Sequence, residues 1–408
     1  MLVNDIITDD DTSVIVVGQF TETVDFDPGA SEYLGTSSYG FDMFVLKLDK
    51  NGVFQWVTII AGTEYGDVGK AIAYDYENDR ILMVGSFSGT VVLSSLWSHD
   101  AQGFPDGLLV IFNDDGEDIG SWQMASVDGY STNPTSIVVG LDGYYVAGSH
   151  TGTTDFYYPV TPFEQSLAGG GEDIFVVKYD LDLNTPVWSR SIGGVQWDAC
   201  LAMTSDYWSD HIVLTGYFEG DVDFDFSPST EDIHQGGAHG AAFILKMGID
   251  GSYVWTRSLI GEPGAYAQGY GIDTDIYSNV YTTGMFGAGL SVDFDPGPGT
   301  YFWPAVGGSD IYVHKVNASG DLVNFDVFGG DYNEQGNDIL AEPYGEHFYN
   351  TGTFLEQTDF LSSPLNDLIL TSYGGQDAYL LKYVLYVPPV SVAEHGTDEW
   401  TCNFILDR

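Results

Sequence analysis

One short sequence pattern returns six times along the chain, at intervals of 63 to 68 residues. It is a β-type run that ends in glycine and usually in phenylalanine. The copies are VVGQF at Gly18, MVGSF at Gly85, VAGSH at Gly148, LTGYF at Gly216, TTGMF at Gly284 and NTGTF at Gly352. Repetition at a fixed period is the signature of a repeat architecture. Because six such units fill nearly all 408 residues, we expect one structural unit repeated six times and no separate catalytic domain.

Each unit reads as four short antiparallel strands. The clearest runs are FVLKL at 44–48, FQWVTII at 54–60, AIAY at 71–74 and ILMVGSF at 81–87. They are rich in β-branched and aromatic residues and are bounded by Asn, Asp or Gly turns, which is typical of hairpins. One such sheet cannot bury both faces alone, whereas twisted sheets arranged radially cover one another. We therefore predict an all-β fold, a β-propeller of six four-stranded blades.

The repeats also set the predicted boundaries. The units span about 1–62, 63–127, 128–194, 195–261, 262–330 and 331–387. They form a single propeller over 1–387, followed by a C-terminal tail or linker remnant at 388–408. The sixth unit has its third strand at 377–382 but no Trp-containing strand after it. The closing blade is therefore either completed by an outer strand at 383–387 or incomplete because a piece of the repeat is missing, and six or seven blades in a longer parent both stay open.

Three motifs carry a resemblance to a known repeat. They are VDFDPG at 24–29, GGSDIYVHK at 307–315 and VWSRSIGG at 187–194. Together they resemble the SBBP-type β-propeller repeat over roughly residues 1–387. The resemblance implies a propeller that is secreted or displayed on the surface of bacteria, notably Bacteroidota, and it implies no single activity. We expect an extracellular or cell-surface location, although this chain shows neither a signal peptide nor the sorting module that many such proteins carry.

Charge restricts the partners. With 60 acidic and 11 basic residues, the formal net charge is −49, which repels nucleic acid and anionic lipid. No apolar run approaches the length of a membrane span, so we expect no membrane insertion. A protein or glycan partner remains. The acidity fits calcium-containing surroundings and fits plain solubility equally well.

Five of the basic residues occupy one register position in the third strand of their units. They are Lys47, Lys178, Lys246, Lys315 and Lys382. A functional basic patch would be local, whereas these lysines recur unit by unit. We expect structural ion pairs between blades, with the aliphatic stem buried and the ammonium group on a carboxylate.

Paired aspartates in the long insertions between the second and third strands are the sharpest candidates for chemistry. The pairs are Asp25 with Asp27, Asp223 with Asp225, and Asp293 with Asp295. Extended backbone projects both carboxylates of a pair to one side, where they suit a hard cation such as Ca²⁺. The alternative is turn capping, in which the aspartates accept backbone N–H groups. We expect no other cofactor.

Aromatic residues in the same insertions are candidates for ligand stacking. They are Tyr157, Tyr158, Tyr301 and Trp303. Such side chains can stack on a sugar ring or a protein partner, and the alternative is packing against their own loops.

The sequence predicts a non-enzymatic binding or adhesion scaffold that uses the face carrying the long loops. We find no GxSxG elbow and no cysteine with a histidine partner, and we predict no catalytic residue. One alternative is a propeller hydrolase or lyase, lactonase-like or glycan-cleaving, with its site at the central channel mouth. Its channel positions would be Asp5, Lys70, Thr135, Asp198, Tyr270 and Asn337. The other alternative is a structural spacer in a larger adhesin.

Overall fold

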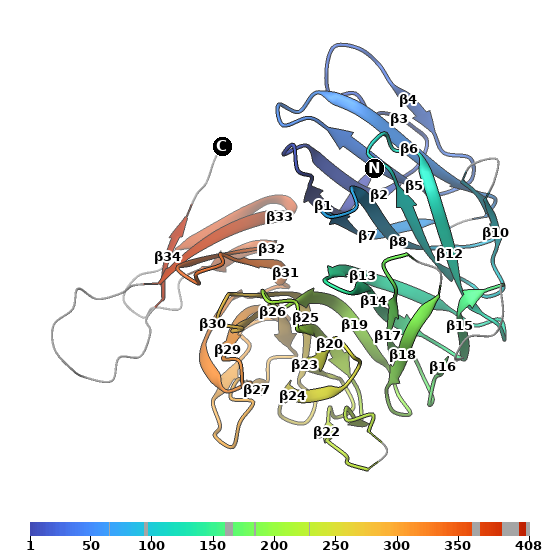
Figure 1. Cartoon of the computed structure of the whole chain (residues 1–408). Coiled ribbons are helices and arrows are strands. Elements are labelled where there is room, and N and C mark those ends of the chain that lie inside the picture. The colour runs from blue at the N-terminus through green and yellow to red at the C-terminus, as the bar shows by residue number, and fades with distance from the viewer. Residues whose placement is uncertain are drawn as a thin grey trace. The chain divides into compact units, whose positions relative to one another are not determined.

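A computed structural model describes residues 1–64, 66–93, 97–159, 166–182, 185–227, 229–360, 368–385 and 400–404. The chain forms two compact units, Met1–Gly193 and Gly194–Arg408 (Figure 1). Throughout the described ranges the regular structure is β-strand. These ranges contain no helix long and apolar enough to cross a membrane. The fold class is all-β, as the sequence predicts.

The first unit contains three blades, each a four-stranded antiparallel meander. The strands of the first blade are β1 (Leu2–Thr8), β2 (Val14–Phe20), β5 (Asp42–Leu48) and β6 (Phe54–Gly62). Those of the second are β7 (Val68–Asp75), β8 (Arg80–Phe87), β11 (Asp106–Phe112) and β12 (Asp118–Ser126). Those of the third are β13 (Thr132–Gly140), β14 (Gly143–His150), β17 (Asp173–Tyr179) and β18 (Pro186–Ile192).

The second unit repeats the same arrangement. The fourth blade has β19 (Asp198–Ser205), β20 (His211–Phe218), β23 (Ala241–Gly248) and β24 (Tyr253–Leu259). The fifth has β25 (Tyr266–Thr274), β26 (Val280–Gly287), β29 (Ser309–Val316) and β30 (Leu322–Gly330). The sixth has β31 (Gln335–Ala341), β32 (His347–Asp359), β33 (Ile369–Leu385) and β34 (Trp400–Phe404).

The strand β34 comes from the segment 388–408, for which the sequence predicts a tail or linker remnant. It pairs antiparallel with the end of β33, with Leu381 opposite Phe404 and Leu385 opposite Trp400. The sixth blade therefore takes its outer strand from residues 400–404, and the alternative of an outer strand at 383–387 is wrong, because residues up to Leu385 continue β33. The intervening segment 386–399 lies outside the described residues.

The recurring glycine is required by a close approach of two backbones. A Cβ atom on Gly18 would lie 2.0 Å from the carbonyl oxygen of Leu2, and one on Gly284 would lie 1.9 Å from that of Gln268. Opposite the glycine, the first strand of each blade, which we call the inner strand, carries a β-bulge. A bulge bends its strand and re-aims the backbone locally. Only a residue without a side chain leaves room for the backbone of the bulge, which explains why glycine recurs at this position in every blade.

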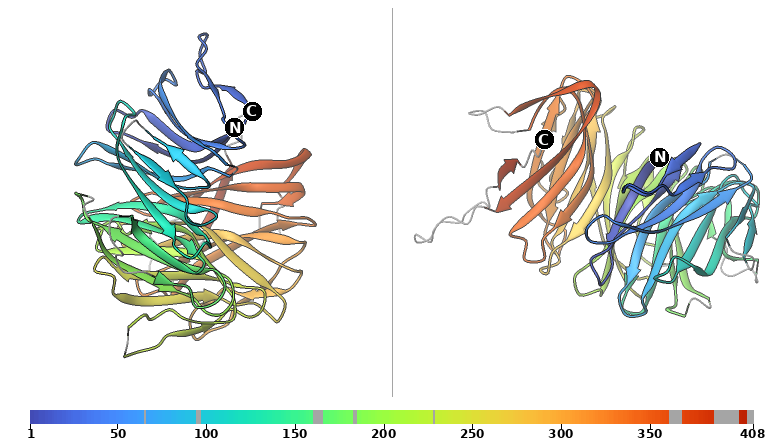
Figure 2. Two further views of the ribbon diagram at one scale, coloured as in Figure 1. Left: turned by 90° about the vertical axis from the view of Figure 1, so that its right-hand side faces the viewer. Right: turned by 90° about the horizontal axis from the view of Figure 1, so that it is seen from above.

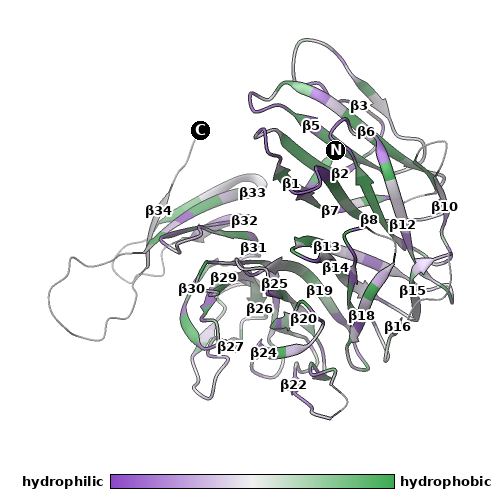
Figure 3. Ribbon diagram, in the orientation of Figure 1, coloured by the Kyte–Doolittle hydropathy of each residue, from purple (hydrophilic) through white to green (hydrophobic). Residues whose placement is uncertain are grey.

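Successive blades within a unit pack face to face, and their alternating apolar residues form the core (Figures 2 and 3). Val17 of the first blade and Met83 of the second belong to one fully buried cluster. Val84 of the second blade and Val146 of the third belong to the next. Full burial of a side chain of this size contributes roughly 1.5–3 kcal/mol. Each blade is therefore stabilised mainly by its neighbours.

The long insertions form small hairpins of their own. Their strands are β3 (Thr23–Asp25) with β4 (Leu34–Thr36), β9 (Thr90–Val92) with β10 (Ser98–Asp100), β15 (Thr153–Tyr158) with β16 (Ser166–Leu167), β21 (Asp221–Asp223) with β22 (Ile233–Gln235), and β27 (Ser291–Asp293) with β28 (Phe302–Pro304). Two of them extend the preceding blade, because β9 pairs with β6 and β15 with β12. The insertions therefore also fasten one blade to the next.

We predict that Gly284→Ala lowers the free energy of unfolding by roughly 1–3 kcal/mol, because the added methyl group meets a backbone carbonyl that cannot move freely. Gly375 has no atom within 4 Å of the place a Cβ would take, so Gly375→Ala is the matched control and should change stability by less than about 0.5 kcal/mol. Urea unfolding followed by tryptophan fluorescence measures both. Equal stability of the two variants would contradict this account of the repeat.

Candidate functional site

The paired aspartates lie where the first strand of an insertion hairpin ends, and they bond to their own turn. Asp25 Oδ1 accepts the N–H of Asp27 at 3.1 Å and that of Tyr33 at 2.9 Å. Asp223 and Asp293 repeat both bonds at the same positions of their hairpins. The second aspartate of each pair caps the next turn by accepting the N–H of Gly29, Ser227 or Gly297. This is the turn-capping geometry that the sequence offers as an alternative to a cation site.

The phenylalanine between the two aspartates points the opposite way and anchors the hairpin. Phe26, Phe224 and Phe294 are each at most 2% exposed. Phe294 stacks on Phe325 with ring centroids 4.8 Å apart and planes 6° from parallel. The pattern Asp-Phe-Asp therefore combines a buried apolar anchor with two turn caps.

The aspartate pairs offer few oxygens for a metal. Across the residues that the structure describes, no group of three or more His, Cys, Asp or Glu side chains is placed to hold a metal ion. Ca²⁺ takes about six to eight oxygen ligands, and one oxygen of each paired aspartate already accepts a backbone N–H group. These contacts support turn capping, and calcium binding by the same pairs stays the untested alternative.

Substitutions at Asp293 separate capping from calcium binding. We expect Asp293→Ala to lower the free energy of unfolding by roughly 1–2 kcal/mol, because two N–H groups lose their acceptor. The matched variant Asp293→Asn keeps an acceptor oxygen and should lose less than half of that. Thermal unfolding with millimolar Ca²⁺ and with chelator should give equal midpoints. A rise with Ca²⁺ that Asp293→Asn abolishes would show a native-state metal site instead.

The register lysines meet carboxylates on the edge opposite the insertions. Lys178 lies 2.6 Å from Asp142, Lys246 3.7 Å from Asp206, and Lys315 4.0 Å from Asp275. Each of these acids belongs to the turn after the first strand of the lysine's own blade. Lys382 instead lies 5.1 Å from the ring centroid of Tyr349, over its face.

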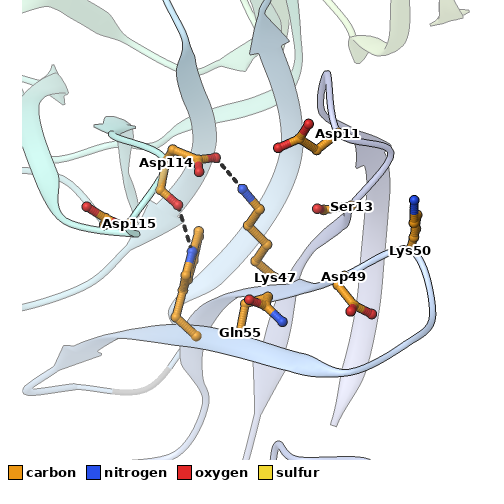
Figure 4. A pocket seen from close by; sticks show the side chains of 9 residues that line it. Asp11, Ser13, Lys47, Asp49, Lys50, Gln55, Asp114 and Asp115 are labelled. Atoms are coloured by element: carbon orange, nitrogen blue, oxygen red, sulfur yellow. Dashed lines mark hydrogen bonds and ion pairs between the residues drawn. The ribbon is translucent and has the colours of Figure 1, made fainter.

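Lys47 joins two blades. Its ammonium group lies 2.8 Å from Asp9 in its own blade and also pairs with Asp114 of the second blade (Figure 4). Burial alone would raise the pKa of Asp9. The hydrogen bonds from Lys47 and Ser13 outweigh it and hold the pKa below its usual value. Removal of one partner from a buried pair is costly because the other charge stays behind, so this contact is structural.

A polar hollow of about 500 Å³ lies at this contact (Figure 4). Its lining residues are Asp11, Ser13, Lys47, Asp49, Lys50, Gln55, Trp56, Asp114 and Asp115. Trp56 Nε1 donates to the carbonyl oxygen of Asp114 at 2.9 Å, and Thr58 donates to that of Gly116 at 2.6 Å. The hollow is therefore the rim of a blade junction, in which the buried cation Lys47 is already neutralised.

Within each unit, the inner-strand bulge presents a different residue in each blade. The bulged residues are Asn4, Lys70 and Thr135 in the first unit and Leu201, Tyr270 and Asn337 in the second. Asp5, a predicted channel position, lies beside the bulge of its strand, whereas Asp198 lies at the start of β19, three residues before the bulged Leu201. Both accept backbone N–H groups. Burial lowers the pKa of Lys70. Within each unit as described, the bulged side chains share no chemistry.

The candidate stacking residues are partly engaged by their own blades. Tyr301 and Trp303 contact Phe325, with ring centroids 4.9 and 6.1 Å apart, and they remain 53% and 37% exposed. Tyr157 and Tyr158 are half-buried in β15. Tyr301 and Trp303 therefore combine packing with an exposed ring surface.

Buried acids at the blade junctions are a feature that the sequence analysis missed. Asp67 and Glu334 are fully buried, and Asp310 is 1% exposed. Burial, with added repulsion from a neighbouring carboxylate, raises the pKa of Asp67 and of Glu334 to about 7. Burial raises the pKa of Asp310 to about 6. The sequence signal that could have revealed Asp67 and Glu334 is an acidic residue immediately before the first strand of a blade.

We predict that ionisation of Glu334 lowers the free energy of unfolding as pH rises. Its folded pKa of about 7 lies above its ordinary value of 4.5, so the native state holds a proton that the unfolded state releases earlier. The stabilisation is complete below about pH 4.5 and is lost as pH rises through 7. Glu334→Gln should therefore gain on the order of 2 kcal/mol over wild type between pH 5 and pH 8.

Urea unfolding at the two pH values measures this gain. The exposed Glu231 provides the matched control, Glu231→Gln, which should follow wild type at both values. A parallel pH dependence in wild type and Glu334→Gln would contradict the assignment.

Comparisons with known proteins agree with the repeat. The family model described as SBBP, a β-propeller repeat, matches residues 254–285. This segment runs from β24 through β25 into β26. The match confirms the resemblance to the SBBP-type repeat, and with the all-β blades it assigns the chain to the β-propeller fold class.

Other similar proteins are more distant. An uncharacterised WD repeat-containing protein of Acanthamoeba polyphaga mimivirus is 26% identical over 225 residues, which is 52% of this chain and 15% of that protein. The chain thus aligns with a small part of that relative. Among solved structures, the Dos1 propeller gives a TM-score of 0.43 at 8% identity over 91% of this chain and 84% of that one. Kluyveromyces lactis Hsv2 gives 0.33 at 8% identity over 92% and 98%, respectively.

Proposed function

We propose that the chain is a non-enzymatic β-propeller scaffold that binds a protein partner through the edge of the blades carrying the insertion hairpins. The observation that supports this proposal most is the concentration of large exposed apolar side chains in these insertions. Leu34 and Phe104 of the first unit are 59% and 66% exposed, and Phe302 and Val306 of the second are 51% and 69% exposed. Exposed apolar patches on a rigid scaffold are typical of protein interaction sites.

The insertions are also well suited to hold such side chains still. Each Asp-Phe-Asp turn is capped by its aspartates and anchored by a buried phenylalanine, as in Phe294. A preorganised surface loses less conformational entropy on binding than a mobile loop does. With a net charge of −49, a neutral or basic partner is favoured electrostatically. We place this binding outside the cell or on its surface, as the SBBP resemblance implies, with adhesion as its role.

The enzyme alternative is less well supported. Catalysis needs a convergent set of polar groups around one substrate position. The bulged residues Asn4, Lys70 and Thr135 of the first unit differ in chemistry, as do Leu201, Tyr270 and Asn337 of the second. We therefore assign the chain a binding role and name no catalytic residue.

Paired variants test the proposal. A double variant, Leu34→Ser with Val306→Ser, should bind at least tenfold more weakly than wild type to any protein that the immobilised full chain captures saturably from extracellular fractions. Leu141→Ser is the matched control, because Leu141 is 64% exposed in a turn on the opposite edge, and it should bind like wild type. Undiminished binding by the double variant, or turnover of ester, lactone or glycoside substrates by the wild type, would contradict the proposal.

A further inference from the structure

A second group of exposed side chains lies on the opposite edge of the second unit. Trp208, Tyr277 and Tyr344 are 60%, 63% and 69% exposed, and we refer to these three as the aromatic row. Each lies in the turn between the first and second strands of its blade, two residues after an acidic turn position that recurs from blade to blade as Asp206, Asp275 or Glu342. Three successive blades therefore present one large ring each from the same place.

The turns that carry the aromatic row are rigid. Asp275 Oδ1 accepts the N–H of Tyr277 at 2.9 Å and that of Asn279 at 3.0 Å, and Asp206 Oδ1 accepts that of Asp210 at 2.9 Å. The residue after each aromatic has a positive φ, which is 53° at Ser209, 57° at Ser278 and 67° at Gly345. The three turns therefore share one backbone shape.

Hydrogen bonds join these turns side by side. Trp208 Nε1 donates to the carbonyl oxygen of Ile276 at 3.1 Å, and the N–H of Ile276 donates to the carbonyl oxygen of Pro343 at 2.8 Å. Ile276 precedes Tyr277, and Pro343 precedes Tyr344. The three rings therefore lie in consecutive, connected positions along one rim.

The fold does not require aromatic residues at this position. In the first two blades, the residues two places after Asp9 and Asp75 are the exposed acids Asp11 and Glu77. Both blades have the same strand order, and the first also has the same five-residue turn with a positive φ three residues after its acid, at Thr12. Large exposed apolar rings weaken solubility without adding to a core. Trp208 bonds a neighbouring turn through its ring edge, but that contact does not explain the exposed rings of Tyr277 and Tyr344, which a ligand would explain.

The surroundings of the row favour a sugar chain over a protein. Tyrosine and tryptophan rings present an apolar face and a polar edge, which match the C–H face and the hydroxyl groups of a pyranose. Asp210 and Glu346 are exposed in the turns of the row, and Asp250 is exposed in the β23–β24 turn on the same edge. Their carboxylates can accept hydrogen bonds from sugar hydroxyl groups. They also interrupt the apolar surface, whereas the centre of a protein interface is depleted of charge. The same carboxylates repel acidic polysaccharides.

We infer that the aromatic row binds a neutral polysaccharide chain, with its sugar rings stacked on Trp208, Tyr277 and Tyr344. This site lies on the other edge of the blades from the proposed protein-binding hairpins and does not depend on them.

Affinity gel electrophoresis of the full chain tests the inference. We expect retardation by at least one soluble neutral polysaccharide among mixed-linkage β-glucan, xyloglucan and galactomannan, and none by the acidic polysaccharide alginate. Substitution of Trp208, Tyr277 or Tyr344 by Ala should each weaken binding roughly three- to tenfold. The triple variant should migrate as if no polysaccharide were present.

Tyr373→Ala is the matched control, because Tyr373 is 92% exposed on the insertion edge of the same unit. It should bind like wild type, and far-ultraviolet circular dichroism should show all variants folded. No retardation by any of the neutral polysaccharides, or full retardation of the folded triple variant, would overturn the inference. Neither result bears on the hairpin variants Leu34→Ser and Val306→Ser, so the two proposals fail separately.

Discussion

The structure depends on a close contact between two backbones, made once in every blade. At the recurring glycine, the bulged inner strand approaches the second strand so closely that a Cβ on Gly216 would lie 1.9 Å from the carbonyl oxygen of Ala199. Protein interiors are densely packed and tolerate little change in side-chain volume. The glycine therefore fixes the register of the first two strands, and with it the alternation that sends valine, isoleucine and phenylalanine into the junctions between blades.

This shared framework gives the two edges of the sheets different roles. One edge carries long hairpins, which are tied back to their blades by capped turns and by buried rings such as Phe224. The other edge carries short turns, where an acid such as Asp142 meets the register lysine of its blade. Exposed apolar side chains gather on the hairpins, while single aromatic rings project from the turns of the second unit. Binding can therefore change on either edge without a change in the core.

Much of the fold was readable from the sequence because it rests on local, periodic signals. The recurring glycine runs, the short β-type stretches such as 81–87 and the turn residues predicted the strands and their order. The outer strand of the sixth blade was not predicted, because Trp400–Phe404 follows a long connection and departs from the repeat pattern. The candidate site was harder. Asp25 and Asp27 were found, but whether their oxygens face a cation or an N–H group depends on the turn geometry, which composition does not encode.

The buried acids and the aromatic row could be recognised only from the three-dimensional structure. Burial of Asp67 and Glu334 became visible only once neighbouring blades were in place. The row formed by Trp208, Tyr277 and Tyr344 also emerged from alignment in space, since the three residues lie 67 to 69 positions apart and share no obvious motif.

Hydrogen–deuterium exchange followed by mass spectrometry tests the central claim most directly, namely that equivalent blades pack into a rigid scaffold for binding. Amides of the two middle strands of a blade are paired on both sides and shielded by adjacent blades, so they should exchange slowest. We predict slow exchange in six peptides that contain the recurring glycines, from Gly18 to Gly352, at the same 63 to 68 residue spacing. Protection confined to one stretch, or rapid exchange at these glycine strands, would contradict the account.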